Sequence, residues 1–163
     1  MTSPAVGLCP EDACRAGRQD GGSAEVGRLR SEKDVRPNAW FFRAHFFQDP
    51  VQQPGSLGIE AMCQLLQYHL LEQGAADGHV DPGFQPVLPG REATWTYRGQ
   101  IIPANRLVRV GMDIVESGTG ARGPYAVADA SLRGDDRCIY RVRGPGMRVV
   151  RGAPPVRVRS SQA

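Results

Sequence analysis

The stretch that decides the fold is WFFRAHFFQDPVQQPGSLGIEAMCQLLQYHLL, residues 40–71. Residues 39–47 are almost all aromatic or apolar, which predicts a buried strand. Residues 48–55 contain two prolines and a glycine and predict a loop. From Ser56, a good N-cap residue, apolar side chains recur at helical spacing on more than one face until Gly74. This pattern predicts one long helix that is wrapped by a sheet.

Short strands are predicted on both sides of this helix. Upstream, residues 27–35 form a mostly polar pattern that predicts an edge strand, and downstream, residues 77–90 predict a proline-containing loop. The further expected strands are residues 92–102, 106–116, 125–133 and 138–142, with 148–150 as an extension of the last. The sequence therefore predicts an α+β fold in which a curved antiparallel sheet wraps around one long central helix. Because one copy would leave a sheet edge and part of the helix uncovered, we expect it to pair.

The chain is long enough for one domain, with 163 residues. Residues 1–26 are rich in small and charged residues without periodicity and predict a disordered leader or linker. Residues 27–151 form the patterned domain, and residues 152–163 predict a flexible tail.

Composition and charge exclude several functional classes. The net charge is only +3, and no dense basic run alternates with aromatics, so nucleic acid is not an expected partner. A secretory signal and an apolar run of about 18 residues are both missing, which predicts a cytoplasmic protein without membrane contact. Four cysteines without a CxxC pair argue against a zinc site.

Four residues in the stretch 40–71 carry candidate chemistry. His45 stands where the aromatic segment meets the Pro/Gly-rich loop, and such loops often hold functional groups. Gly55 and Ser56 start the helix, so their free amides and the helix dipole can hold an oxygen that gains negative charge. Glu60 follows one turn later, although a carboxylate there also stabilises the helix for purely structural reasons.

Taken together, residues 40–71 resemble the signature of FabA-type 3-hydroxyacyl-ACP dehydratases, which adopt the hotdog fold. That signature runs from WFF through a histidine to DPV, PG, LG, an acidic residue and a helix. The segments AHFFQDPV and PGSLGIE look closest to FabA-like dehydratase regions of polyunsaturated fatty acid and polyketide-type synthases. The resemblance continues through TYRGQIIPANRLVRVGMDI (96–114) and VADASLRGDDRCIYRVRGPGMRV (127–149), and so covers about three-quarters of the chain.

The resemblance implies an activity and a role for each matching residue. His45 matches the family's catalytic histidine, and Glu60 matches its catalytic acid. The Gly55 amide matches the group that holds the thioester carbonyl. The Val51 carbonyl matches the group that orients the histidine. Ser56 would lie beside the substrate. The implied reaction removes water from a 3-hydroxyacyl thioester on acyl carrier protein to give a 2-enoyl thioester, as in fatty acid or polyketide biosynthesis. The implied partners are acyl carrier protein and a second hotdog domain, identical or not. No metal or organic cofactor is implied.

The chemistry suits these residue types. A neutral imidazole can remove the Cα proton, and the β-hydroxyl leaves as water only if Glu60 delivers a proton. Apolar surroundings would raise the pKa of Glu60 toward that state. The expected apolar wall consists of Phe41, Phe42, Phe46, Phe47 and Leu57.

Several alternatives stay open at this point. The loop carries Gln52 and Gln53 where the family usually has one residue, which raises the alternative of a catalytically degenerate partner subunit. A hotdog acyl thioesterase is a further alternative, and isomerisation of the new double bond is undecided. The acyl chain length is undecided as well, as is whether the chain is free-standing or part of a megasynthase.

Overall fold

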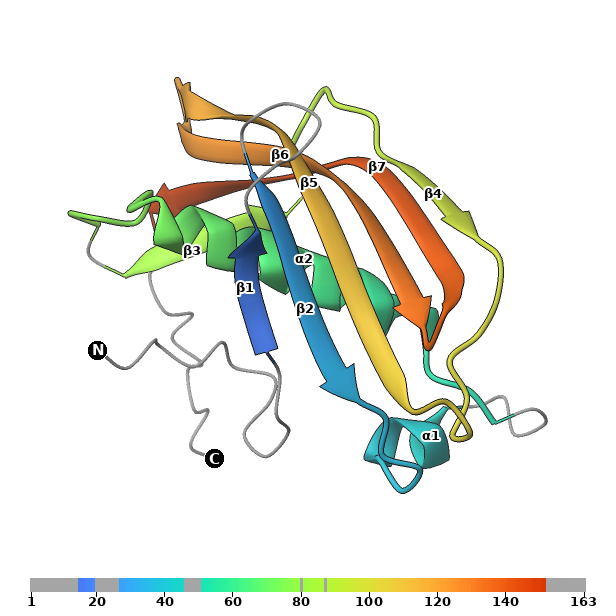
Figure 1. The fold of residues 1–163 in the computed structure, drawn as a ribbon. Coiled ribbons are helices and arrows are strands. Elements are labelled where there is room, and N and C mark those ends of the chain that lie inside the picture. Colours follow the sequence, from blue (N-terminus) through green and yellow to red (C-terminus); the bar gives the residue numbers. More distant parts are fainter. Residues whose placement is uncertain (1–14, 20–26, 46–50, 80, 87, 152–163) are drawn as a thin grey trace, which may run out of the picture.

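The computed structural model describes residues 15–19, 27–45, 51–79, 81–86 and 88–151 of the chain. Within these residues, seven strands form one sheet and two segments are helical (Figure 1). The elements in chain order are β1 (Arg15–Gln19), β2 (Arg28–Asp34), α1 (Trp40–Ala44), α2 (Gly55–Glu72), β3 (Pro82–Pro86), β4 (Thr94–Tyr97), β5 (Leu107–Gly120), β6 (Gly123–Gly134) and β7 (Arg137–Arg151).

The sheet is antiparallel throughout and runs in the order β1-β2-β5-β6-β7-β3, while β4 pairs with the first part of β7. The expected meander of the last three long strands is confirmed. Its register shifts between Ile114 and Glu116 and again between Val127 and Asp129. Such bulges increase local twist and bend the strands, which lets the sheet curl around α2.

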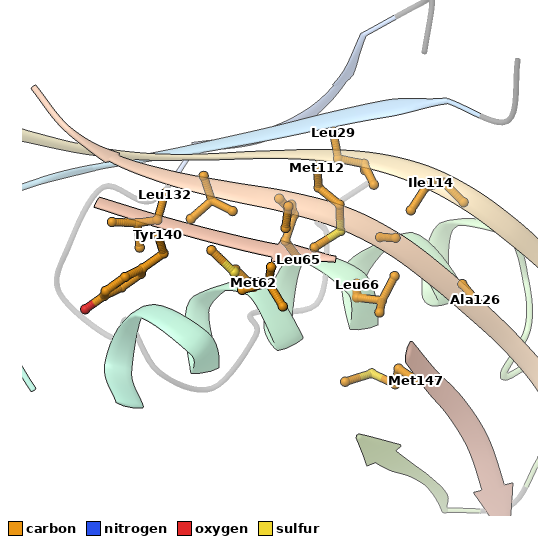
Figure 2. Packing of buried hydrophobic residues seen from close by; sticks show 14 of the residues in the cluster. Leu29, Met62, Leu65, Leu66, Met112, Ile114, Ala126, Leu132, Tyr140 and Met147 are labelled. Carbon is orange, nitrogen blue, oxygen red and sulfur yellow. The ribbon is translucent and has the colours of Figure 1, made fainter. Parts of the chain in front are cut away.

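Helix α2 lies across the concave side of the sheet, as predicted (Figure 1). Met62, Leu65, Leu66 and Leu70 on this helix are at most 3% exposed. Figure 2 shows Met62, Leu65 and Leu66 facing the inner side chains of the strands, and each such burial contributes about 2 kcal/mol. Packing against the sheet therefore holds this helix. The sheet side of the core includes Leu29, Met112, Ile114, Ala126, Leu132, Tyr140, Met147 and Val149.

The prediction of a buried strand over residues 39–47 was wrong. Trp40–Ala44 forms the short helix α1, which buries Phe42 at 2% exposure and leaves Trp40 at 65%. A short apolar run does not distinguish a strand from a helix, and one turn of helix is enough to bury one ring. Phe46 and Phe47 lie outside the described residues.

The sheet is also larger than the sequence predicted. Strand β1 lies inside the expected leader and pairs with β2, so β2 is an inner strand and not an edge. Strand β3 lies in the expected loop, with prolines at both ends, where an edge strand tolerates them. Strand β4 is shorter than predicted, whereas β5 continues past its predicted end at residue 116 to Gly120. In each case pairing with a distant strand decided the outcome.

Neither described helix has the length and hydropathy needed to cross a membrane.

Candidate active site at the start of helix α2

Helix α2 begins one residue earlier than predicted. Its N-cap is Pro54 and its first residue is Gly55, so Ser56 is an exposed residue of the first turn and not the cap. The Leu57 amide donates to the Pro54 carbonyl at 3.1 Å. No described residue accepts a hydrogen bond from the amides of Gly55 or Ser56. These two donors, at the positive end of the helix dipole, can bind an oxygen that carries negative charge.

An aromatic cluster closes over this end of the helix. Tyr140 stacks on Tyr97 with ring centroids 5.1 Å apart, and Trp95 meets the Tyr140 ring edge-on at 5.8 Å. A Cβ on Gly55 would lie 3.7 Å from both the Tyr140 hydroxyl oxygen and Cη2 of Trp95. Both side chains therefore approach the Gly55 backbone, and sequence reasoning missed both. Trp95 alternates with Tyr97 along β4, which indicates only that these two rings share a face of the sheet.

Glu60 lines a cavity of about 130 Å³ between α2, α1 and the sheet. The carboxylate is exposed and accepts a hydrogen bond from Gln64 Nε2 at 3.2 Å. Two members of the expected apolar wall, Phe41 and Leu57, line this cavity, whereas Phe42 belongs to the core. The further apolar lining comes from Val35, Trp40, Ala61, Val108, Val110 and Leu132. An acidic group at the rim of an apolar cavity suits an acyl substrate with a polar reacting end.

His45 lies on a different element. It is the half-buried C-cap of α1, and its amide donates to the Phe41 carbonyl at 3.1 Å. His45 is not among the described residues that line the Glu60 cavity. Among the described residues, the lining of the Glu60 cavity therefore comes from α2, α1, the Gln53 loop and the sheet, without a contribution from this histidine. Val51 is half-buried and packs against the core.

Gln52 and Gln53, the two glutamines of the loop, both make contacts within the domain. Gln52 is 8% exposed, and the Gln53 amide donates to the Ile101 carbonyl at 2.8 Å. Gln53 also lines the Glu60 cavity. The segment that contains the extra residue is therefore hydrogen-bonded to the loop before β5. This contact lies immediately before Gly55 in the chain.

A family model described as FabA-like domain matches residues 12–143 of this sequence. The chain belongs to the FabA-like family. The match begins ahead of β1 and ends in β7, so it takes in the sheet, both helices and all five predicted site positions.

Solved structures with the same fold include several thioesterases. This FabA-like domain superposes on a mutant of the fluoroacetyl-CoA-specific thioesterase FlK with a TM-score of 0.53 and 13% identity, over 82% of this chain and 91% of the other. A hypothetical thioesterase protein from Streptococcus pneumoniae, solved with coenzyme A, superposes with a TM-score of 0.52 and 10% identity. The match covers 86% of this chain and 89% of the other. A thioesterase family protein from Silicibacter pomeroyi superposes with a TM-score of 0.50 and 12% identity, over 85% of each chain. At these identities the likeness establishes the hotdog fold alone, which confirms the predicted fold class.

Other polar features of the FabA-like domain lie away from this site. Arg91 forms a salt bridge with Glu116 at 2.6 Å. An arginine-lined hollow of about 400 Å³ opens on the face of the sheet away from α2 and contains none of the predicted site residues. Within the described ranges, no group of three or more His, Cys, Asp or Glu side chains is placed to hold a metal ion.

Proposed function

We propose that this FabA-like domain removes water from a 3-hydroxyacyl thioester carried on an acyl carrier protein and releases the 2-enoyl thioester. The observation that carries the proposal is the arrangement on α2. The Gly55 amide has no acceptor among the described residues, and Glu60 stands one turn further along at an apolar cavity. The resemblance of residues 40–71 to FabA-type dehydratases assigns the same two positions to the thioester carbonyl and to the acid.

Each step then has a residue of suitable chemistry. The Gly55 amide binds the thioester oxygen as charge develops on it, which makes the Cα proton more acidic. His45 removes that proton as the base, and Glu60 acts as the acid that delivers a proton to the departing β-hydroxyl. The acyl chain occupies the cavity lined by Phe41 and Leu57.

We infer that the site is completed by a second copy of the domain. Two observations support this: His45 is not among the described residues that line the Glu60 cavity, and Glu60 is exposed. Among the described strands β4 pairs only with β7, and its other side offers a surface for a second copy, because Trp95 and Tyr97 on this strand are 49% and 47% exposed. Exposed aromatics on an edge strand favour association. A second copy at this edge would cover both rings beside the start of α2.

A thioesterase is the second candidate, and the exposure of Glu60 favours it. A carboxylate in contact with water can activate that water against the same carbonyl held by Gly55. A 3-hydroxyacyl pantetheine thioester separates the two reactions. The dehydratase gives the ultraviolet absorbance of an enoyl thioester without free thiol, and the thioesterase gives free thiol without the enoyl signal. Release of thiol alone would overturn the proposed function.

A further inference from the structure

Tyr140 reaches from β7 onto the first turns of α2. Figure 2 shows its ring extending from the strand toward the helix, with the hydroxyl at the outer end. Its hydroxyl oxygen lies 3.7 Å from the position of a Cβ on Gly55, the residue whose amide we assign to the thioester oxygen. Gly58 provides the space for this, because any side chain there would overlap the Tyr140 ring. Because Gly55 and Gly58 lack side chains, the phenol ring of Tyr140 can pack against the first turns of α2.

The Tyr140 hydroxyl is buried without a hydrogen-bond partner among the described residues, although the residue is only 1% exposed. A buried polar group without a partner costs folding free energy, and phenylalanine would fill the same space without that cost. Burial, with a smaller contribution from Tyr97, holds the pKa of Tyr140 well above its ordinary value. The hydroxyl therefore keeps its proton at neutral pH and can donate a hydrogen bond, but it cannot act as a base.

We propose that the Tyr140 hydroxyl is the second donor to the thioester carbonyl oxygen, beside the Gly55 amide. This inference rests on the proposed function, because it takes the thioester to be the ligand at the start of α2. One oxygen that gains negative charge has lone pairs for two donors, and a preorganised second donor stabilises it further. Trp95 covers the same point and is half exposed on an edge strand, so we expect the ligand to displace the indole and not the buried tyrosine.

Two substitutions of tyrosine by phenylalanine test this role. Tyr140→Phe removes only the unpaired hydroxyl, whereas the control Tyr125→Phe removes a hydroxyl that donates to Glu116 at 2.6 Å, away from the site. We expect Tyr140→Phe to lower kcat for dehydration about 100-fold with little change in KM, the size of effect known for loss of one such donor. Its unfolding temperature should stay unchanged or rise. Tyr125→Phe should show the opposite pattern, with a lower unfolding temperature and unchanged kcat.

A second measurement does not depend on turnover. The infrared C=O stretch of a bound enoyl pantetheine thioester, carbon-13 labelled at the carbonyl, falls in frequency with each hydrogen bond to the oxygen. We expect the stretch to be higher in Tyr140→Phe than in the wild type and unchanged in Tyr125→Phe. Equal frequencies in all three proteins, or an unchanged kcat in Tyr140→Phe, would overturn the role of Tyr140 while leaving the dehydratase in place.

Failure of the proposed function gives a different result. If the wild type only hydrolyses the thioester, dehydration is excluded, while the carbonyl stretch and the hydrolysis rate still test Tyr140. If the wild type neither converts nor binds the thioester, both proposals are wrong.

Discussion

Gly58 and Tyr140 are packed so closely that a Cβ on the glycine would overlap Cε2 of the tyrosine ring. Gly58 lies in the helix and Tyr140 in the last strand, so this contact sets how near the start of α2 comes to the sheet. It also holds the Tyr140 hydroxyl beside Gly55 and Trp95. The geometry of the candidate site therefore depends on the absence of one side chain.

Replacement of Gly58 by alanine should lower the stability of the domain. We expect Gly58→Ala to lower the free energy of unfolding by about 1–3 kcal/mol, the usual cost of overpacking a core, because neither the helix nor the ring can move freely. Gly111→Ala is the matched control, since its Cβ would meet only Ser131 Oγ at 3.7 Å. It should leave stability unchanged or raise it by up to about 1 kcal/mol. Denaturant unfolding measures both, and equal stability of the two variants would contradict the packing described here.

The exposed aromatics on β4 predict where a second copy binds. We expect Trp95→Lys to shift the native mass from dimer toward monomer, because a charged side chain opposes burial in an interface. Val115→Lys is the control, since Val115 is 38% exposed on β5, away from this edge. Native mass spectrometry over a range of concentrations distinguishes the two. A Trp95→Lys dimer as tight as the wild type would place the interface elsewhere.

The hairpin between β6 and β7 predicts a dependence of stability on pH. The Asp135 carboxylate accepts hydrogen bonds from Asn105 Nδ2 at 3.0 Å and from the amides of Arg106 and Leu107 at 2.9 and 3.0 Å. The Asn105 bond, followed by the two amides, holds the pKa of Asp135 below its ordinary 3.8. Because the folded pKa is the lower one, this stabilisation is present above pH 3.8 and disappears as the pH falls through the lowered pKa.

Asp135→Asn tests that dependence and keeps a residue type that tolerates the positive φ of 51°. We expect the variant to unfold at a lower temperature than the wild type near neutral pH, with the difference shrinking in acid. Asp136→Asn, at a fully exposed side chain in the same turn, should show a pH profile like that of the wild type. A constant difference between Asp135→Asn and the wild type at every pH would show that ionisation of Asp135 contributes nothing.

The sequence predicted the long helix and the meander because their apolar spacing extends over many residues. It did not predict α1, since WFFRA is too short for its spacing to separate a helix from a strand. Strands β1 and β3 were missed because their conformation is fixed by pairing with β2 and β7 and not by their own patterns. Tyr140 carried no signal either, because Ile139 beside it is equally buried and the pair shows no alternation.

Glu60 and His45 should each be required for dehydration. Glu60→Gln keeps the shape of the side chain and its place beside Gln64 but cannot deliver a proton, so we expect dehydration to fall by at least about 100-fold. Glu72→Gln, at the exposed far end of the same helix, should retain full activity. His45→Ala should be as inactive as Glu60→Gln while remaining dimeric. Initial rates of enoyl thioester formation check all three variants.

In the proposed mechanism, one active site combines His45 of one copy with Glu60 of another. The most direct test mixes the inactive His45→Ala and Glu60→Gln proteins and lets their subunits exchange. Half of the dimers then pair the two variants, and each of these holds one site with both residues intact. We expect the mixture to recover about a quarter of the wild-type rate, as a twofold dimer with two shared sites requires. A mixture that exchanges subunits, as shown by native mass, yet stays inactive would contradict the shared site.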